Sequence, residues 1–325
     1  MLIRRAVRYP KTFLLPLCAT ALSTVQLSTL LGQSLYFDPN GNELSGSGVE
    51  EGQTYDWSEA SSFWSTSSFG TSFDANTGWQ NGASAVFSAS SATAPFSVQV
   101  ALTGIHVARL EVANGNLTIA AGGGGISTSS STFITNVAGG YALNWSDGLT
   151  SMPTNAVLEK QGAGTLVLGA LAPTTITLRL GNGILRTSAN SALATTAPLR
   201  VEGNYRLELS GTTQSIGTLA TSASGGPVNL VDLGGGSLTV RQWESGTVQL
   251  GTEGTFTVSD PNATLGTNRT LSSGRTEGAG TFIKDDAGTL VLGTSAGLAH
   301  SGDVEVRGGT LAISTSNYGI AQNYA

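Results

Sequence analysis

The sequence predicts an all-β protein in which short strands stack into a solenoid. The decapeptide KQGAGTLVLG, residues 160–169, returns as KDDAGTLVLG at residues 284–293, with eight of ten positions identical across a separation of 124 residues. Strand-like segments recur about every 8 to 12 residues, a spacing that by itself also fits a sandwich or barrel. No segment of 12 or more residues has convincing helical periodicity. One such unit cannot bury its leucine face alone, whereas stacked copies can, which favours a solenoid.

Within each copy, alternation separates the side chains into two faces. Leu166 and Leu168 share one face and Thr165 and Val167 the other. We therefore expect the leucines to face the interior and the glycines beside each strand to allow the chain to turn. The residues that define this structural repeat are Lys160, Gly164, Leu166, Leu168 and Gly169 in the first copy, and Lys284, Gly288, Leu290, Leu292 and Gly293 in the second.

The composition excludes several classes of protein. Charged residues make up 11% of the 325 residues and hydrophobic residues 39%, a balance that does not fit a disordered chain. The 44 glycines follow no three-residue period, which excludes collagen. What remains is a Gly-, Ser- and Thr-rich β protein with many short strands.

Residues 1–34 have the features of a secretory signal peptide. Four basic residues and no acidic residue come first, and the apolar run FLLPLCATAL follows. The alternative is an N-terminal membrane anchor, but Pro16 and the polar residues after Leu22 interrupt the apolar run, so cleavage before Leu35 is favoured. Leu17 precedes Cys18, where a lipoprotein signal would place a small residue. Cys18 is the only cysteine, so the mature chain would have no disulfide or thiol.

Removal of this leader would leave an acidic protein. Subtracting its four basic residues from 15 leaves 11 against 21 acidic residues, a net charge of 11 − 21 = −10. This balance argues against nucleic acid or an anionic membrane surface as a partner. No integral membrane span is predicted in the mature chain.

Residues 35–95 are rich in aromatic residues, and residues 96–325 carry the strand repeats. An aromatic platform for carbohydrate is one interpretation of the first segment. We favour a cap that covers the open end of the solenoid, because solenoid ends need special terminal units. The aromatic residues concerned are Trp57, Trp64, Trp79, Phe63, Phe69, Phe73 and Phe87.

No catalytic, cofactor-binding or metal-ligating residue is predicted. His106 and His300 are the only histidines and are far apart in the sequence, which disfavours a zinc site. No G-x-S-x-G elbow is predicted on a strand-to-helix turn. Asp285 and Asp286 are adjacent, so their side chains would diverge in a strand, and we expect them to form a solvated turn.

The second repeat carries a resemblance to a known family. Its residues resemble the pattern of the autotransporter-associated β-strand repeat proteins of Gram-negative bacteria, although Asp286 stands where that family prefers Gly and the first copy lacks the upstream Gly-x-Gly. The resemblance covers roughly residues 155–315, with a weaker match over residues 35–154. The matching positions are Gly278, Gly280, Phe282, Lys284, Gly288, Leu290, Leu292 and Gly293, followed by Gly308, Gly309 and Leu311.

This resemblance implies a right-handed parallel β-helix that is exported and displayed at the cell surface or secreted. In that fold Lys160 and Lys284 are expected at one position of the coil, as solvent-facing residues that discourage sideways strand pairing. The expected function is that of a non-catalytic structural or adhesive surface protein, an adhesin-like passenger associated with the outer membrane. Expected partners are extracellular glycans or host and cell-surface components. The alternative is a carbohydrate-active β-helix enzyme or carbohydrate-binding module.

Overall fold

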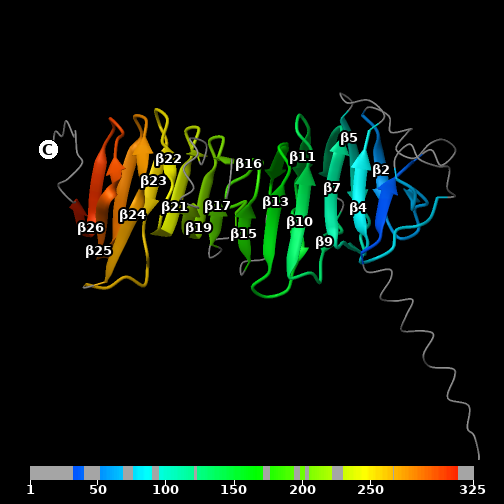
Figure 1. Cartoon of the computed structure of the whole chain (residues 1–325), viewed down its shortest axis with the longest axis horizontal. Coiled ribbons are helices and arrows are strands. Elements are labelled where there is room, and N and C mark those ends of the chain that lie inside the picture. Colours follow the sequence, from blue (N-terminus) through cyan, green and yellow to red (C-terminus); the bar gives the residue numbers. More distant parts are fainter. Residues whose placement is uncertain are drawn as a thin grey trace, which may run out of the picture.

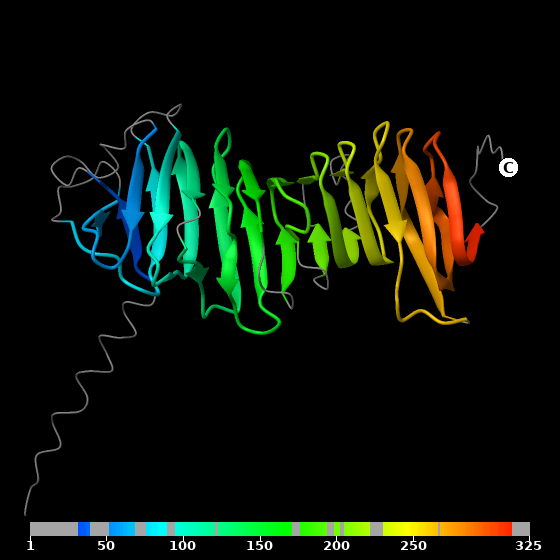
Figure 2. The same ribbon diagram turned by 180° about the vertical axis from the view of Figure 1, so that it is seen from behind.

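The computed structural model is an elongated β-solenoid of about 9 turns, which confirms the predicted fold class. Figures 1 and 2 show the coils stacked along the long axis of the molecule, with the N-terminal coils at one end and the C-terminal coils at the other. The structure describes residues 32–39, 52–68, 76–89, 95–120, 123–170, 176–193, 198–201, 205–221, 230–265 and 267–313, and this part of the chain contains no helix. The expected leader lies outside these ranges except for its last three residues.

Two ladders of parallel strands run along the solenoid. The first ladder contains β1 (Ser34–Phe37), β4 (Ser84–Ser88), β7 (Arg109–Asn114), β10 (Thr132–Val137), β13 (Val157–Gln161), β15 (Thr177–Leu180), β17 (Leu199–Val201) and the end of β19 (Thr213–Thr221). The second ladder contains β2 (Thr54–Trp57), β5 (Pro95–Val100), β8 (Asn116–Ala120), β11 (Ala142–Trp145), β14 (Thr165–Leu168), β16 (Gly183–Thr187), β18 (Tyr205–Glu208), β20 (Leu230–Asp232), β22 (Thr247–Gln249) and the end of β24 (Asn268–Glu277).

The third side of the coils changes along the solenoid. Near the N-terminus it is the short sheet β6 (Ile105–His106), β9 (Ile126–Ser127) and β12 (Leu149–Ser151). Nearer the C-terminus it is a longer third ladder, formed by the start of β19, the start of β21 (Ser237–Trp243), β23 (Thr255–Val258), the start of β25 (Thr281–Leu298) and the start of β26 (Val304–Ile313). The parallel pairing of successive coils excludes the sandwich and the up-and-down barrel.

Aligned apolar side chains fill the interior. In the second ladder Leu166, Leu185, Leu207, Val231 and Val248 lie directly above one another in successive coils, and each is at most 1% exposed. The strands carry the alternating burial pattern that the sequence predicts, with every second residue buried and apolar and the residues between them towards solvent. The parallel register therefore builds one continuous core from many short strands.

The corner glycines have a steric reason. A Cβ atom at Gly164 would lie 2.3 Å from the Ala138 carbonyl oxygen, and one at Gly169 would lie 2.5 Å from the Ser146 carbonyl oxygen. Both carbonyl groups belong to the preceding coil, so any larger residue would push the coils apart. These two glycines therefore allow the close approach of neighbouring coils, and the positive φ at this corner belongs to Gly162, at 74°.

The aromatic-rich segment caps the N-terminal end, as predicted. Eight rings pack together with centroid separations of 4.7–6.4 Å. β3 (Trp64–Ser65) pairs antiparallel with β1 on the edge opposite β4, which covers the end of the first ladder. The rings are those of Phe37, Tyr55, Trp57, Phe63, Trp64, Trp79, Phe87 and Phe96; Phe69 and Phe73 lie outside the described residues.

Candidate functional site: buried corner lysines and a hydroxyl-bearing face

Lys160 holds a corner of the solenoid from the inside. Its side chain is fully buried, and Nζ donates to the carbonyl oxygens of Gln161 and Gly162 at 2.7 Å and of Asn182 at 3.0 Å. The first two carbonyls belong to its own corner and the third to the corner of the next coil. Burial lowers the pKa of Lys160 to about 8, so the amine is still largely charged at neutral pH. Its three N–H groups then match three carbonyl acceptors.

Lys284 builds the same arrangement in the second copy. Its side chain is also fully buried, and Nζ donates to the Asp286 carbonyl oxygen at 2.6 Å and to the Gly308 carbonyl oxygen of the next coil at 3.0 Å. The third acceptor of Lys284 is a carboxylate oxygen rather than a carbonyl oxygen: Nζ donates to Asp286 Oδ1 at 3.0 Å. Each repeat copy therefore uses its lysine to join two consecutive corners.

The prediction that these lysines face solvent is wrong. Leu158 and Phe282 stand two residues earlier and are buried, so alternation places Lys160 and Lys284 on the same inward side. β13 ends at Gln161, one residue after Lys160, and the pairing of β25 with β26 shifts register directly after Lys284, so the regular pairing of backbone carbonyl groups is interrupted at both places. A buried carbonyl needs a donor, and the lysine provides it. The period-two pattern was the sequence signal that could have revealed this burial.

The expectation that the two lysines share one position of the coil is also wrong. Lys160 pairs with Leu180 of β15, in the first ladder. Lys284 pairs with Val258 of β23, in the third ladder. The following TLVL strands are displaced in the same way: β14 belongs to the second ladder, whereas residues 289–292 of β25 pair with the beginning of β24. The repeated sequence thus specifies one local arrangement, and the solenoid uses it at two different corners of the coil.

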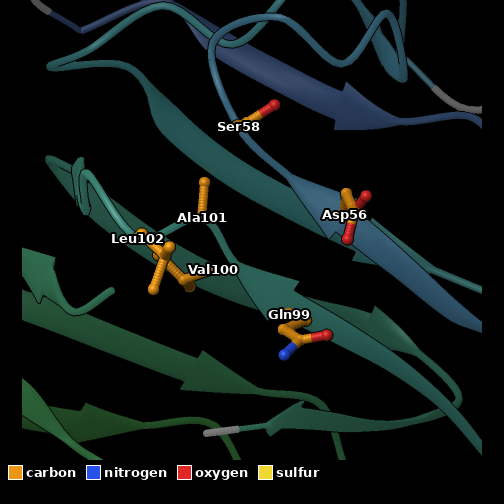
Figure 3. Close-up of a pocket in the computed structure, with 6 residues that line it drawn as sticks. All are labelled: Asp56, Ser58, Gln99, Val100, Ala101 and Leu102. Carbon is orange, nitrogen blue, oxygen red and sulfur yellow. The ribbon is translucent and has the colours of Figure 1, made fainter. Parts of the chain in front are cut away.

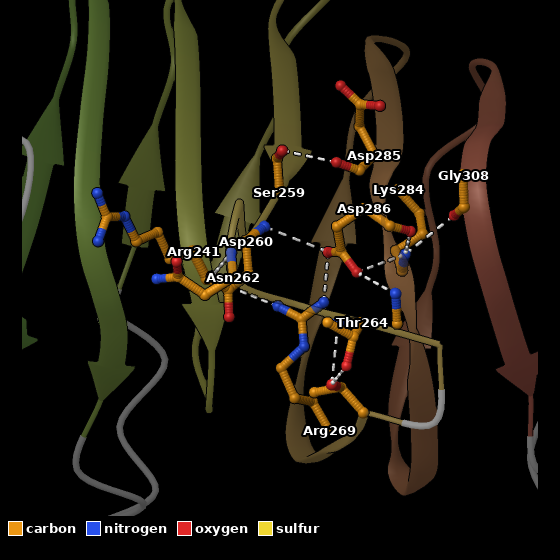
Figure 4. A network of polar contacts seen from close by, with 12 residues as sticks. Arg241, Ser259, Asp260, Asn262, Thr264, Arg269, Lys284, Asp285, Asp286 and Gly308 are labelled. Atoms are coloured by element: carbon orange, nitrogen blue, oxygen red, sulfur yellow. Dashed lines mark hydrogen bonds and ion pairs between the residues drawn. The ribbon is translucent and has the colours of Figure 1, made fainter.

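Asp286 lies in a buried ion-pair network, which corrects the expectation of a solvated turn. Its side chain is 2% exposed and contacts Lys284 and the guanidinium of Arg269 (Figure 4). Burial alone would raise the pKa of Asp286, but hydrogen bonds from Lys284, Arg269 and the backbone N–H groups of Gly288 and Asp260 outweigh it and lower the pKa. Asp285 is exposed, so the two side chains do diverge. A carboxylate held by two cations cannot act as a general acid.

The two histidines have structural contacts and are not brought together. The Ser129 N–H donates to His106 Nε2 at 3.1 Å, and His106 Nδ1 lies 3.3 Å from Ser127 Oγ. His300 lies between β25 and β26, near the other end of the array. Its Nε2 contacts the Asp303 carbonyl oxygen at 3.1 Å, and its Nδ1 lies 2.7 Å from Thr276 Oγ1. Burial lowers the pKa of His300.

A shallow recess of about 280 Å³ lies near the N-terminal cap (Figure 3). Asp56 of β2 and Gln99 of β5 lie opposite each other in register, and Leu102 lies in the turn that follows β5. Leu102 is 81% exposed. The recess offers one carboxylate, whereas glycoside hydrolysis ordinarily uses a pair.

Hydroxyl side chains form two rows on the outer face of the third ladder. One row aligns Thr213, Ser237, Thr255 and Thr281 in successive coils, and the second aligns Ser215, Thr239 and Thr257. All seven side chains lie at positions that reach solvent. Strand geometry sets the spacing at about 4.8 Å between coils and about 6.6 Å between the rows. Sequence reasoning missed this face because the alignment depends on the strand register.

Charged residues on the second ladder link neighbouring coils. Arg186 contacts Glu208, and Arg206 contacts both Glu208 and Asp232. The arginine side chains are 43% and 45% exposed, so each pair adds little to stability. These contacts cover the outer surface with paired charge and do not form a catalytic arrangement.

In the part of the chain that the structure describes, the class of protein is assigned from the fold alone. Within them, no group of three or more His, Cys, Asp or Glu side chains could hold a metal ion, and no helix has the length and hydropathy needed to cross a bilayer. Comparison of the chain with protein-family models, curated proteins and solved structures found no match. The chain is therefore a parallel β-solenoid repeat protein, with buried polar corners and a hydroxyl-bearing outer face.

Proposed function

We propose that this protein is an exported, non-catalytic surface or secreted protein with a structural or adhesive role, similar to an autotransporter passenger of a Gram-negative bacterium. The observation that carries the proposal is the pair of hydroxyl rows on the third ladder. A regular surface of this kind can form many weak hydrogen bonds with a hydroxylated polymer. The buried Lys160, Lys284 and Asp286 side chains are engaged in holding corners together and are not available for catalysis.

An elongated solenoid suits adhesion because every coil presents similar groups. Each contact between one hydroxyl and one sugar is weak in water, since it replaces hydrogen bonds with solvent. Several contacts made by one rigid face act together, so the effective affinity rises by avidity. The expected ligand class is therefore an extended glycan or polysaccharide rather than a single sugar in a deep pocket.

Export requires processing of the N-terminus. We expect signal peptidase to remove about 34 residues, because basic residues, an apolar run and small residues precede Leu35. N-terminal sequencing of the exported protein measures this directly, and surface protease treatment of intact cells reports its location. A mature chain that retains Arg4 and Arg5, or one that stays inside the cell, would contradict export.

Binding to polysaccharide should depend on the hydroxyl face. We expect the purified mature chain to be retained on insoluble cellulose, chitin or cross-linked dextran, with little competition from free monosaccharides. Replacing Thr239 and Thr257 with Val keeps the side-chain shape and removes two central hydroxyls. We expect this double variant to lose retention by about tenfold, a loss of roughly 1.4 kcal/mol. Depletion from solution at a series of matrix loadings gives the affinity.

The matched control is Thr118→Val with Thr165→Val on the second ladder, which we expect to leave retention unchanged. Equal effects of the two double variants would remove the hydroxyl face as the binding surface. Reducing-end assays on the same polysaccharides address the enzyme alternative. Turnover that disappears when one acidic residue, such as Asp56, is changed while the fold stays intact would establish the carbohydrate-active enzyme instead.

A further inference from the structure

We propose that two copies of this chain join through their β26 strands to form a two-fold symmetric, tail-to-tail dimer. The starting observation is the exposure of inward-facing residues at this end of the described solenoid. Val304 and Val306 are 36% and 47% exposed, although their ladder neighbours Phe282 and Lys284 are fully buried. Apolar residues in core positions need a covering layer.

The two ends of the solenoid differ in how they are covered. At the N-terminal end, β3 and the aromatic cluster cover the edge of β1. At the other end, Leu311 and Ile313 continue the inward rows of Leu290 and Leu292 and remain partly exposed. A head-to-tail contact would have to displace the aromatic cap, so a contact between two identical β26 edges is favoured. Such a contact is closed and does not extend into a filament.

Among the described residues β26 pairs only with β25, so its other edge presents backbone hydrogen-bonding groups. Phe282 N–H donates to the Asp303 carbonyl oxygen at 2.9 Å, so the Asp303 carbonyl points towards β25. Peptide groups alternate in direction along a parallel strand. The N–H and C=O groups of Val304 and Val306 therefore point away from β25. Val306 can exchange both of its backbone hydrogen bonds with Val306 of a second, antiparallel copy.

This register is also complementary in charge. When Val306 lies on the two-fold axis, Glu305 lies opposite Arg307 of the second copy, and Arg307 lies opposite its Glu305. In one chain Arg307 Nη2 already contacts Glu305 Oε2 at 2.9 Å, with both side chains about half exposed. The dimer would bring two glutamates and two arginines together in alternation. Opposite charges directly across an antiparallel pair stabilise that pairing.

The dimer would extend the hydroxyl-bearing face described above. The free edge of Val304 and Val306 belongs to the third ladder, which carries the two hydroxyl rows. Antiparallel pairing keeps opposite residues on the same side of a sheet. Both sets of rows would then face the same way, and the number of contacts available to one polymer would double. The dimer itself does not depend on the proposed function.

Cysteine cross-linking tests the register. Cys18 is the only native cysteine, so the mature chain, which begins near Leu35, gives a thiol-free background. Val306→Cys places two thiols directly opposite each other, and we expect oxidation to yield a disulfide-linked dimer. Val304→Cys is the matched control: the two copies lie four residues apart along the strands, about 13 Å, beyond the reach of a disulfide. Equal cross-linking of both variants, or none, would refute the proposed register.

Charge reversal tests the interface in solution. By sedimentation velocity we expect a dimer of the native chain, a shift to monomer for Glu305→Arg, and recovery of the dimer when Arg307→Glu is added. Glu111→Arg, which reverses a similar Arg109–Glu111 pair on β7, should leave the dimer intact. A monomeric native chain, a filament, or a dimer insensitive to Glu305→Arg would overturn the proposal. So would a chain that dimerises only after residues 314–325 are removed, because its own terminus would then cover the edge.

Discussion

Replacing Leu168 with Asp is expected to destabilise the solenoid by about 4 kcal/mol or more, because it buries an unpaired charge. Leu168 is fully buried and lies directly between Trp145 of the preceding coil and Thr187 of the next. Leu292 is equally buried between Leu271 and Ile313, so Leu292→Asp should also be severe. Urea unfolding followed by tryptophan fluorescence measures the loss, since Trp145 lies next to the first substitution.

Val167→Asp is the matched control, one residue away on the opposite side of the same strand. Val167 is half-buried and lies opposite Arg186 of the next coil, so the new carboxylate reaches solvent and a cation. We expect a change below about 1 kcal/mol, the range of ordinary surface substitutions. Similar losses for Leu168→Asp and Val167→Asp would show that both sides of the strand are buried.

The effect should also be local along the array. In a solenoid each coil contacts only its neighbours, so stability is close to a sum over coils and their interfaces. Hydrogen exchange in Leu168→Asp should rise most in β14 and in β11 and β16, the two strands that pair with it. Loss of protection spread evenly over the whole solenoid would indicate one cooperative unit instead.

The core was predictable from the sequence because it depends on local alternation. TLVL places Leu166 and Leu168 on one side of a strand whatever the rest of the chain does, and both are buried. The aromatic cap was predictable for a similar reason, since exposed coil ends need a cover. Both predictions use one property of a short segment and need no knowledge of which coils are neighbours.

The lysine corners could not be predicted in the same way. Lysine generally prefers solvent, whereas the inward side chains of Leu158 and Phe282, two residues earlier, place Lys160 and Lys284 on the inward side. At these corners the inward position prevails because the carbonyl groups need donors. The placement of the copies on different ladders depends on coil length, which varies: partners Leu158 and Leu178 are 20 residues apart, and partners Val248 and Thr276 are 28 apart. A separation of 124 residues therefore does not specify a whole number of coils.

The network around Asp286 shows how one departure from the repeat changes a corner. In the first copy Gly162 supplies a carbonyl group to Lys160, and the three hydrogen bonds that its amine donates within the described residues all go to carbonyl oxygens. In the second copy Asp286 occupies the equivalent position and adds a carboxylate that contacts both Lys284 and Arg269. Arg269 comes from β24, and its Nη1 also donates to the Arg241 carbonyl oxygen of β21. Asp286 and Arg269 together thus link three strands of the C-terminal coils.

Replacing Asp286 with Asn should therefore be strongly destabilising, by about 3 kcal/mol or more, because it leaves two buried cations without their anion. Asp285→Asn is the control: this exposed neighbour should change stability by less than about 0.5 kcal/mol.

The pKa of Asp286 is lowered in the folded state, so its contribution to stability is complete above the unfolded pKa near 4 and is lost as pH falls through the folded value. The difference in unfolding free energy between the native chain and Asp286→Asn should shrink as pH is lowered from 7 to about 3. A difference that stays constant with pH, or equal effects at Asp285 and Asp286, would show that the charge of Asp286 does not stabilise this corner.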